Sequence, residues 1–227
     1  LILGSVKNLK YLNLGGIQFS GTIPPQLGNL SKLQYLDLSG MAGTESTDMS
    51  WLMEHLTSLV FLDLSINNII GPLPTSIGQY LISSAVLDLQ GNNFTGPISK
   101  SIGNFTSLRT LDLSANHLNG HVPYEIGMLT NLTELYLNIN YLGGVIKEGH
   151  FAGIRSLEHI YLSANSLKIE LSSEWQPPFR LHSACFAFCQ MGPLFPAWLQ
   201  WHVDIQYLDI SSTDITDRLP HWFANAC

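Results

Sequence analysis

Apolar residues return along the chain at a nearly fixed interval of 24 to 26 positions. Each unit opens with the pattern L-x-x-L-x-L-x-x-N, as in Leu59 to Asn67 and Leu108 to Asn116. Side chains alternate between the two faces of a strand, so the two leucines of L-x-L point inward and the residue between them points outward. The first positions of the units are Leu9, Leu33, Leu59, Ser84, Leu108, Leu132, Leu157, Leu181 and Ile205.

A period of this length predicts a repeat protein in which each unit forms one turn of a solenoid. We expect an α/β repeat fold, with a curved parallel β-sheet on the concave face and with short strands, turns and short helices on the convex side. Residues 1–227 then form a single solenoid of about nine repeats. Leu3 and Val6 match the end of a preceding unit, and Leu219 to Phe223 begin another, so we expect both ends to lie within repeats, without caps.

An asparagine ends the motif in five successive units. Its amide both donates and accepts hydrogen bonds, so it can satisfy backbone groups where the chain turns away from the strand. We therefore assign this asparagine ladder a structural role. Its members are Asn67, Asn92, Asn116, Asn140 and Asn165, and the same position holds Ile17, Met41, Cys189 and Thr213 in other units.

The second half of several units carries the phrase L-x-G-x-[IVL]-P. It occurs at Phe19–Pro24, Ile69–Pro74 and Leu118–Pro123, with looser copies at Leu142–Ile146 and Ile215–Pro220. Glycine permits a bend close to the neighbouring backbone, and proline ends a short extended segment because it lacks a donor. In this phrase the chain resembles the plant-specific class of leucine-rich repeats.

Three turns break the phrase, after Leu38, Leu167 and Cys189, and the first of them (41–56) is more helix-like than the others. With these irregular turns the whole chain resembles the extracellular part of plant receptor-like proteins. The resemblance implies a ligand-binding ectodomain that perceives an extracellular peptide, protein or glycan in defence or development. It also implies signalling through partner receptor kinases, and a place at the extracellular face of the plasma membrane or in the cell wall.

Composition and charge narrow the classes of protein and of binding partner that remain possible. The chain is 45% hydrophobic and 12% charged, which is typical of globular proteins. A formal charge of −7 without a cluster of Lys and Arg argues against a nucleic-acid partner. A run of about 18 apolar residues, as a transmembrane helix needs, does not occur in the sequence.

Four triplets match the acceptor motif for N-glycosylation, beginning at Asn29, Asn93, Asn104 and Asn131. Asn29 and Asn104 both precede the next unit's first leucine by four residues, in the turn outside the strand. We expect some of these sites to be used if the chain follows a secretory route.

The cysteines lie near the C-terminal end. His182, Cys185 and Cys189 have a spacing that a metal ion could use. We expect no shared ion, because Cys185 occupies an outward strand position and Cys189 replaces the ladder asparagine and points into the core. Cys185 is thus predicted to be a free exposed thiol and Cys189 a buried one, while the partner of Cys227 is expected beyond the end of the chain.

The outward position between the strand leucines holds Asp in most units, within the phrase Leu-Asp-Leu-Ser. We interpret that Asp as part of the scaffold. Two units depart from it with Tyr136 and Tyr161, next to Glu134 and His159 in the neighbouring outward column. Tyrosine offers broad contact area at low entropic cost, so these four residues are candidate ligand-binding residues. The alternative is that these four residues are ordinary solvent-exposed side chains of a sheet and bind no ligand. A second candidate stripe holds Tyr11, Tyr35 and Phe61.

Catalysis has little support in the sequence. The motifs Gly-x-Ser-x-Gly and His-Glu-x-x-His are absent, and the repeated Asp column gives each carboxylate much the same environment. We predict neither an enzyme, a cofactor nor a metal. Two other functions stay open: a secreted inhibitor of a cell-wall hydrolase, similar to plant polygalacturonase inhibitors, and an ice-binding protein. Ice binding needs evenly spaced threonines, and Thr22, Thr75 and Thr95 do not share a register.

Overall fold

The computed structural model describes residues 6–18, 23–41 and 50–224. Leu3, most of the first Gly-Pro phrase, part of the irregular turn after Leu38 and Cys227 lie outside the described residues.

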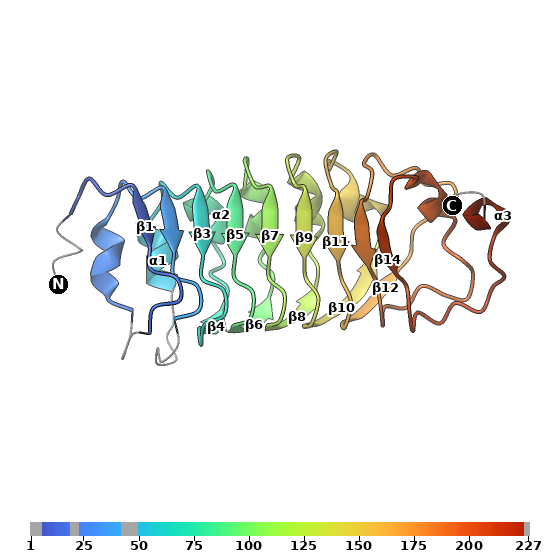
Figure 1. Ribbon diagram of the computed structural model, residues 1–227, viewed down its shortest axis with the longest axis horizontal. Helices are drawn as coiled ribbons and strands as arrows, with labels where there is room; N and C mark the ends of the chain where they lie inside the picture. Colours follow the sequence, from blue (N-terminus) through green and yellow to red (C-terminus); the bar gives the residue numbers. More distant parts are fainter. Residues whose placement is uncertain (1–5, 19–22, 42–49, 225–227) are drawn as a thin grey trace.

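The described strands of the repeats form one parallel sheet, as the sequence predicts. Its nine strands are hydrogen-bonded in the order in which they occur along the chain, and they stand side by side along the long axis of the molecule (Figure 1). The register places equivalent positions of successive repeats opposite one another, as with Leu36 and Leu62. The strands are β1 (Tyr11–Asn13), β2 (Tyr35–Asp37), β3 (Phe61–Asp63), β5 (Val86–Asp88), β7 (Thr110–Asp112), β9 (Glu134–Tyr136), β11 (His159–Tyr161), β13 (Ser183–Cys185) and β14 (Tyr207–Asp209).

A second parallel sheet is formed by the extended segments that follow the ladder position. Figure 1 shows it along the lower edge of the molecule, beneath β3 to β14. Gly96 and Gly120 adopt positive φ angles of 76° and 75° within it, which explains the glycine of the Gly-Pro phrase. Its strands are β4 (Ile70–Pro72), β6 (Asn93–Pro97), β8 (His117–His121), β10 (Tyr141–Ile146) and β12 (Ser166–Ile169).

Short helices lie along the chain between successive strands of the nine-stranded sheet, except α3, which follows β14, and α1 and α2 lie behind that sheet (Figure 1). α1 confirms the helical tendency predicted for the turn after Leu38, and it buries Leu52. Among the described residues, no helix is long and apolar enough to cross a membrane. The helices are α1 (Ser50–His55), α2 (Ile77–Tyr80), α3 (His221–Ala224) and the 3-10 helices η2 (Pro25–Asn29), η3 (Lys100–Asn104), η4 (Tyr124–Met128), η5 (Glu148–Phe151) and η6 (Ala197–Trp201).

One continuous core runs through the repeats. The strand leucines, such as Leu62 and Leu87, are fully buried, and each contributes roughly 2 kcal/mol from the apolar area it removes from water. Where the turns become irregular, aromatic side chains replace the aliphatic ones. Phe151, Trp175 and Phe179 pack ring against ring with centroids 5.7 to 6.2 Å apart, so this part of the core is filled without the regular phrase.

The asparagine ladder holds successive turns together. Asn116 donates from Nδ2 to the carbonyl oxygens of Leu89, Leu113 and Ser114, and its Oδ1 accepts from the backbone N–H of Phe94. The other four members make equivalent bonds within their own repeat and to the neighbouring ones. These are the backbone groups that a buried turn must satisfy.

The residue before the ladder position has a positive φ in each described turn out of a strand. Three turns use glycine there, and the others use larger residues, which pay a steric cost in this region. Ile66 and Ile139 are the most strained of these, because they are β-branched. The glycines are Gly16, Gly40 and Gly91, and the others are Ile66, Ala115, Ile139, Ala164, Phe188 and Ser212.

Candidate ligand-binding site

The sheet brings together the four residues that break the repeat. β9 and β11 pair in parallel so that Tyr136 lies opposite Tyr161 and Glu134 lies opposite His159. The two tyrosine rings are 5.2 Å apart and inclined at 38°. All four side chains are half-buried, so each retains a surface that a ligand can contact.

A third tyrosine belongs to this cluster, and the sequence analysis missed it. Tyr207 of β14 stacks on Tyr161 of β11, with the ring centroids 6.2 Å apart and the planes 9° from parallel. The strand between them, β13, carries only Ser183, Ala184 and Cys185, whose small side chains let the two rings lean over it. We call Tyr136, Tyr161 and Tyr207 the C-terminal tyrosine cluster. Its signal in the sequence is a small-residue strand between two strands that carry tyrosine.

The prediction that Cys185 is an exposed thiol is wrong. Cys185 lies in the expected concave column, opposite Tyr161 and Asp209, but only 7% of its surface is exposed. It lies on the strand between those of Tyr161 and Tyr207, whose rings stack 6.2 Å apart, and its Sγ lies 3.7 Å from Oδ2 of Asp209. An outward register position therefore does not guarantee exposure when both neighbouring strands carry large rings.

Cys189 is buried, as predicted, and its thiol fills the ladder position. Its Sγ donates to the carbonyl oxygen of Leu162 at 3.5 Å, the same kind of bond to the preceding repeat that the ladder asparagines make. Burial, with a smaller contribution from Cys185, raises the pKa of Cys189 to about 12. The side chain is thus a protonated structural thiol at neutral pH.

Tyr136 keeps its hydroxyl proton over a wide pH range. Burial first, and then the charge of Glu134 and the neighbouring Tyr161 and Asp112, raise its pKa to about 12. Glu134 in turn accepts a hydrogen bond from Oγ1 of Thr110 at 3.2 Å. The site therefore offers a neutral phenol donor next to a carboxylate acceptor.

A column of aspartates occupies the middle strands of the concave face. Each carboxylate accepts a hydrogen bond from the backbone N–H two residues later, as Asp88 does from Gln90 at 3.0 Å, which is a turn-forming role. Burial raises the pKa of Asp88 to about 6, and the negative charges of Asp112 and Asp63 add to that effect. The pKa of Asp112 is also raised, again mainly by burial.

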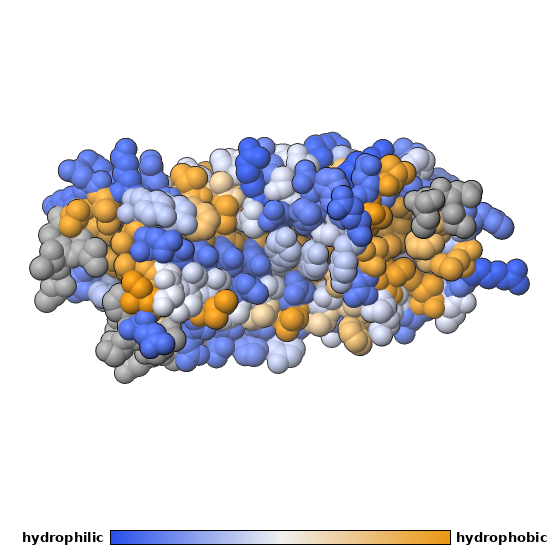
Figure 2. Space-filling view, viewed as in Figure 1, coloured by the Kyte–Doolittle hydropathy of each residue, from blue (hydrophilic) through white to orange (hydrophobic). Residues whose placement is uncertain are grey.

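The second predicted aromatic stripe is continuous at the other end of the sheet. The rings of Tyr11, Tyr35 and Phe61 stack in sequence, each pair with centroids 4.2 Å apart. We call these three residues the N-terminal aromatic stripe. Between the two aromatic groups lie β5 and β7 with their aspartates, and the surface over these middle strands is largely hydrophilic (Figure 2).

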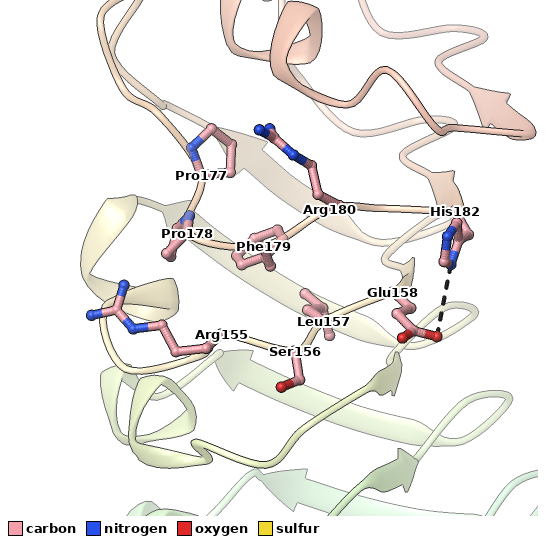
Figure 3. A pocket seen from close by; sticks show the side chains of 9 residues that line it. All are labelled: Arg155, Ser156, Leu157, Glu158, Pro177, Pro178, Phe179, Arg180 and His182. Atoms are coloured by element: carbon pink, nitrogen blue, oxygen red, sulfur yellow. Dashed lines mark ion pairs between the residues drawn. The ribbon is translucent and has the colours of Figure 1, made fainter.

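A cavity of about 370 Å³ opens beside the C-terminal tyrosine cluster. It lies between the segment that enters β11 and the irregular turn that enters β13, and sequence reasoning did not find it. Figure 3 shows Glu158 and His182 pointing toward each other at one end, where Oε2 and Nδ1 are 3.7 Å apart. The guanidinium groups of Arg155 and Arg180 project away from that pair. The lining residues are Arg155, Ser156, Leu157, Glu158, Pro177, Pro178, Phe179, Arg180 and His182.

The four predicted glycosylation asparagines are all exposed. Asn29 is the last residue of η2, Asn104 the last of η3, and Asn93 the first of β6. Asn131 donates from Nδ2 to the carbonyl oxygen of Thr106 at 2.8 Å. Their attachment to a glycan stays a prediction.

Comparison with known proteins decides the family. The family described as "Leucine-rich repeat region" matches residues 3–218, nearly the whole chain. The chain belongs to the leucine-rich repeat family. The predicted fold class is thereby confirmed, because the period, the parallel sheet and the family agree.

The relatives confirm the resemblance to plant receptor-like proteins. Receptor-like protein EIX2 of Solanum lycopersicum is 44% identical over 82 residues, a match that covers 36% of this chain and 8% of the tomato protein. The match thus covers only a small part of its relative's length, and what the whole tomato protein does is not carried over by it.

Solved leucine-rich repeat ectodomains superpose well on this chain. The ectodomain of the plant membrane receptor kinase GASSHO1/SCHENGEN3 from Arabidopsis thaliana, in complex with CASPARIAN STRIP INTEGRITY FACTOR 2, has a TM-score of 0.85 and 27% identity, over 99% of this chain and 27% of that chain. The Arabidopsis receptor kinase HAESA, in complex with the peptide hormone IDA and the co-receptor SERK1, has a TM-score of 0.72 and 29% identity, over 92% and 38%.

Proposed function

We propose that this leucine-rich repeat chain is a ligand-binding segment of a plant receptor-like ectodomain, which perceives an extracellular peptide, protein or glycan. The observation that carries the proposal is the C-terminal tyrosine cluster on the concave sheet. Tyr136 and Tyr161 stand in the outward column that holds aspartate in most strands, and Tyr207 stacks on Tyr161 from the neighbouring column. Tyrosines of this kind supply rigid contact area together with hydroxyl donors. We expect binding without catalysis.

A peptide is the ligand class that the geometry favours. From the N-terminal aromatic stripe at β3 to the cluster at β9 the sheet advances three strands, or about 14 Å at ~4.8 Å per strand. An extended chain covers about 3.3–3.6 Å per residue, so four to five residues bridge the two groups. The aspartates between them suit a basic side chain at the centre of such a peptide. The peptide hormone bound to HAESA, a structural relative, supports the same ligand class.

The same relatives support a proposal about partners and location. We propose that the parent protein signals through a receptor kinase as co-receptor or adaptor, and that this chain faces the extracellular side of the plasma membrane or the cell wall. The exposed acceptor triplets at Asn29, Asn93, Asn104 and Asn131 support the secretory route. Expression through a plant secretory pathway followed by glycosidase treatment tests this, since an unchanged mass would contradict it.

Binding is tested by selecting ligands for the purified chain from a phage-displayed peptide library, with a panel of cell-wall oligosaccharides in parallel. The variant Tyr136→Ala/Tyr161→Ala is expected to bind the selected peptides at least ~30-fold more weakly, as loss of a hot spot of about 2 kcal/mol implies. Tyr141→Ala is the matched control, because Tyr141 is exposed on β10 in the other sheet.

Circular dichroism and urea unfolding of each variant separate lost binding from lost folding. Tyr207→Ala provides a second test, because Tyr207 is the most exposed member of the cluster and its removal disturbs the core least. Unchanged affinity in both the double variant and Tyr207→Ala would remove the site. Inhibition of a polygalacturonase by the wild-type chain, without selection of any peptide or oligosaccharide, would favour the inhibitor function in its place.

Ice binding is disfavoured by the register of the second sheet. Thr95 of β6 is aligned with Pro72 on one side and with His117 on the other, so a flat row of threonines does not form there. Thr22 lies outside the described residues.

A further inference from the structure

We propose that Glu158, His159 and His182 form a binding site for a divalent transition-metal ion of the zinc type, at the edge of the concave sheet. Each of the three side chains offers one ligand atom, and these atoms all lie within 4.8 Å of one another. The site does not depend on the proposed function, because it rests on coordination chemistry alone. The sequence analysis predicted no metal here, having weighed His182 only with the cysteines.

The repeat holds the three ligands in place through the backbone. The N–H of His182 donates to the carbonyl oxygen of Glu158 at 2.8 Å, and the N–H of Ser183 donates to the same oxygen at 3.1 Å. β11 and β13 then pair His159 with Ser183. Two ligands therefore come from the start of one repeat's strand and the third from the equivalent point of the next, so an ion would join two turns of the solenoid.

His159 already has the contact that orients a metal-binding histidine. Its Nδ1 lies 2.7 Å from Oγ of Ser183, a half-buried hydrogen bond that engages this nitrogen and fixes the ring. Nε2 is the nitrogen left for an ion. Metal-bound histidines characteristically use one nitrogen for the metal and the other for such a partner, whose loss weakens binding 10- to 100-fold.

The ligand atoms need only a small movement to close on an ion. Tetrahedral zinc, with bonds of about 2.0–2.1 Å to nitrogen and oxygen, places its ligands roughly 3.4 Å apart. Oε2 of Glu158 and Nδ1 of His182 are 3.7 Å apart, and their side chains are 49% and 42% exposed, so both have room to rotate. The arginines of the adjoining cavity point away from this pair and do not occupy the position of the ion (Figure 3).

The set of donors selects the class of metal. Two imidazoles and one carboxylate suit zinc and neighbouring first-row ions, whereas calcium and magnesium require oxygen ligands in larger numbers. The competing explanation is a simple surface ion pair between Glu158 and His182, which is worth at most about 1 kcal/mol. An ion pair requires no contribution from His159, and this difference separates the two explanations.

Zinc binding to the tag-free chain is the test, measured by isothermal titration and by competition with a chromogenic zinc indicator. We expect one zinc ion to bind to this site, and the binding to persist in millimolar calcium. His182→Gln, Glu158→Gln and His159→Gln should each weaken it at least ~10-fold, and Ser183→Ala should weaken it about 10-fold through the ring of His159. His121→Gln is the control, since His121 is an exposed histidine of β8 outside the group.

A structural readout supplements affinity. The imidazole signals of His159 and His182, assigned from the variants, should shift in nitrogen-proton correlation spectra when zinc is added, while that of His121 stays in place. Equal binding by wild type and His159→Gln would overturn the proposal, as would equal weakening by His121→Gln or displacement by calcium. Glu158→Gln repeats the test if another variant fails to fold.

Discussion

At the residue scale, the turns that leave the strands are strained where a residue other than glycine has a positive φ. Ile66 has a φ of 53° and is 66% exposed, so it gains little from burial. Its counterpart in the next repeat is Gly91, with a φ of 64°. The strain of an L-residue in this region is about 1–2 kcal/mol, whereas the extra entropy that glycine loses on folding is about 0.5–1 kcal/mol.

We therefore expect Ile66→Gly to raise the free energy of unfolding by about 0.5 kcal/mol, and Gly91→Ala to lower it by about 1 kcal/mol. A Cβ on Gly91 would lie 3.6 Å from the nearest atoms of Ile66, which is ordinary contact, so the loss comes from the backbone angle alone. Urea unfolding of the two variants measures both values. A less stable Ile66→Gly would show that the side chain contributes more than its backbone costs.

The raised pKa of Asp88 predicts the direction in which the free energy of unfolding changes with pH. Its pKa in the folded chain is about 6, above the ordinary value, so the folded state holds this proton more tightly than the unfolded state does. The group therefore destabilises the fold at pH above 6, and the effect disappears below about pH 4, where both states are protonated. Asn in its place can still accept the hydrogen bond from the N–H of Gln90.

Asp88→Asn should accordingly stabilise the chain by about 1 kcal/mol at pH 8, a value reduced for the partial solvent exposure of the side chain. At pH 4 the difference should vanish. Asp209→Asn is the control with the opposite sign, because hydrogen bonds from Ser211 lower the pKa of Asp209 and so favour its charged form in the fold. Denaturant titrations at the two pH values test both, and a gain that persists at pH 4 would contradict the electrostatic cause.

At the scale of the element, the asparagine ladder joins the strands to the second sheet. Asn116 is 4% exposed and makes four hydrogen bonds to backbone groups, two in its own repeat and two in the preceding one. Asn116→Ala leaves a buried amide and carbonyl groups without this partner, which we expect to cost about 2–4 kcal/mol of unfolding free energy. Thermal or urea unfolding measures it. Asn119 is an exposed residue of β8, so the control variant Asn119→Ala should have a free energy of unfolding within about 0.5 kcal/mol of wild type. An equal loss of stability in both variants would show that the ladder asparagine has no special structural role.

The elements also show why some of the site was predictable and some was not. Because one repeat period fixes the register, it was enough to place Tyr136 opposite Tyr161 and to bury Cys189. The burial of Cys185 depends on rings from two other strands, which no single unit contains. The cavity arises where the turn through Pro177 to Arg180 departs from the period, so its geometry could not be obtained by repetition. The proposed zinc-type site instead uses regular register positions, and it was missed because His182 was weighed only with the cysteines.

At the scale of the whole molecule, a solenoid can stay folded while the distance between two groups on its surface changes. Each repeat contacts mainly its neighbours, so removal of one complete unit should leave the others folded. Residues 84–107 are such a unit, since Ser84 and Leu108 are equivalent positions. Their deletion brings β3 beside β7 and shortens the distance between the N-terminal aromatic stripe and the C-terminal tyrosine cluster by about 4.8 Å.

If one extended peptide spans both aromatic groups, this deletion should weaken its binding at least ~10-fold although every aromatic side chain remains, because the two contacts no longer fit one backbone. The matched control replaces residues 84–107 with a copy of residues 108–131, which has the same 24-residue length and restores the spacing with altered sequence. Affinities of the selected peptides for the two variants decide the matter. Tight binding by the deletion variant would place the ligand on one aromatic group alone, whereas recovery in the copied-repeat variant would tie recognition to the pitch of the sheet.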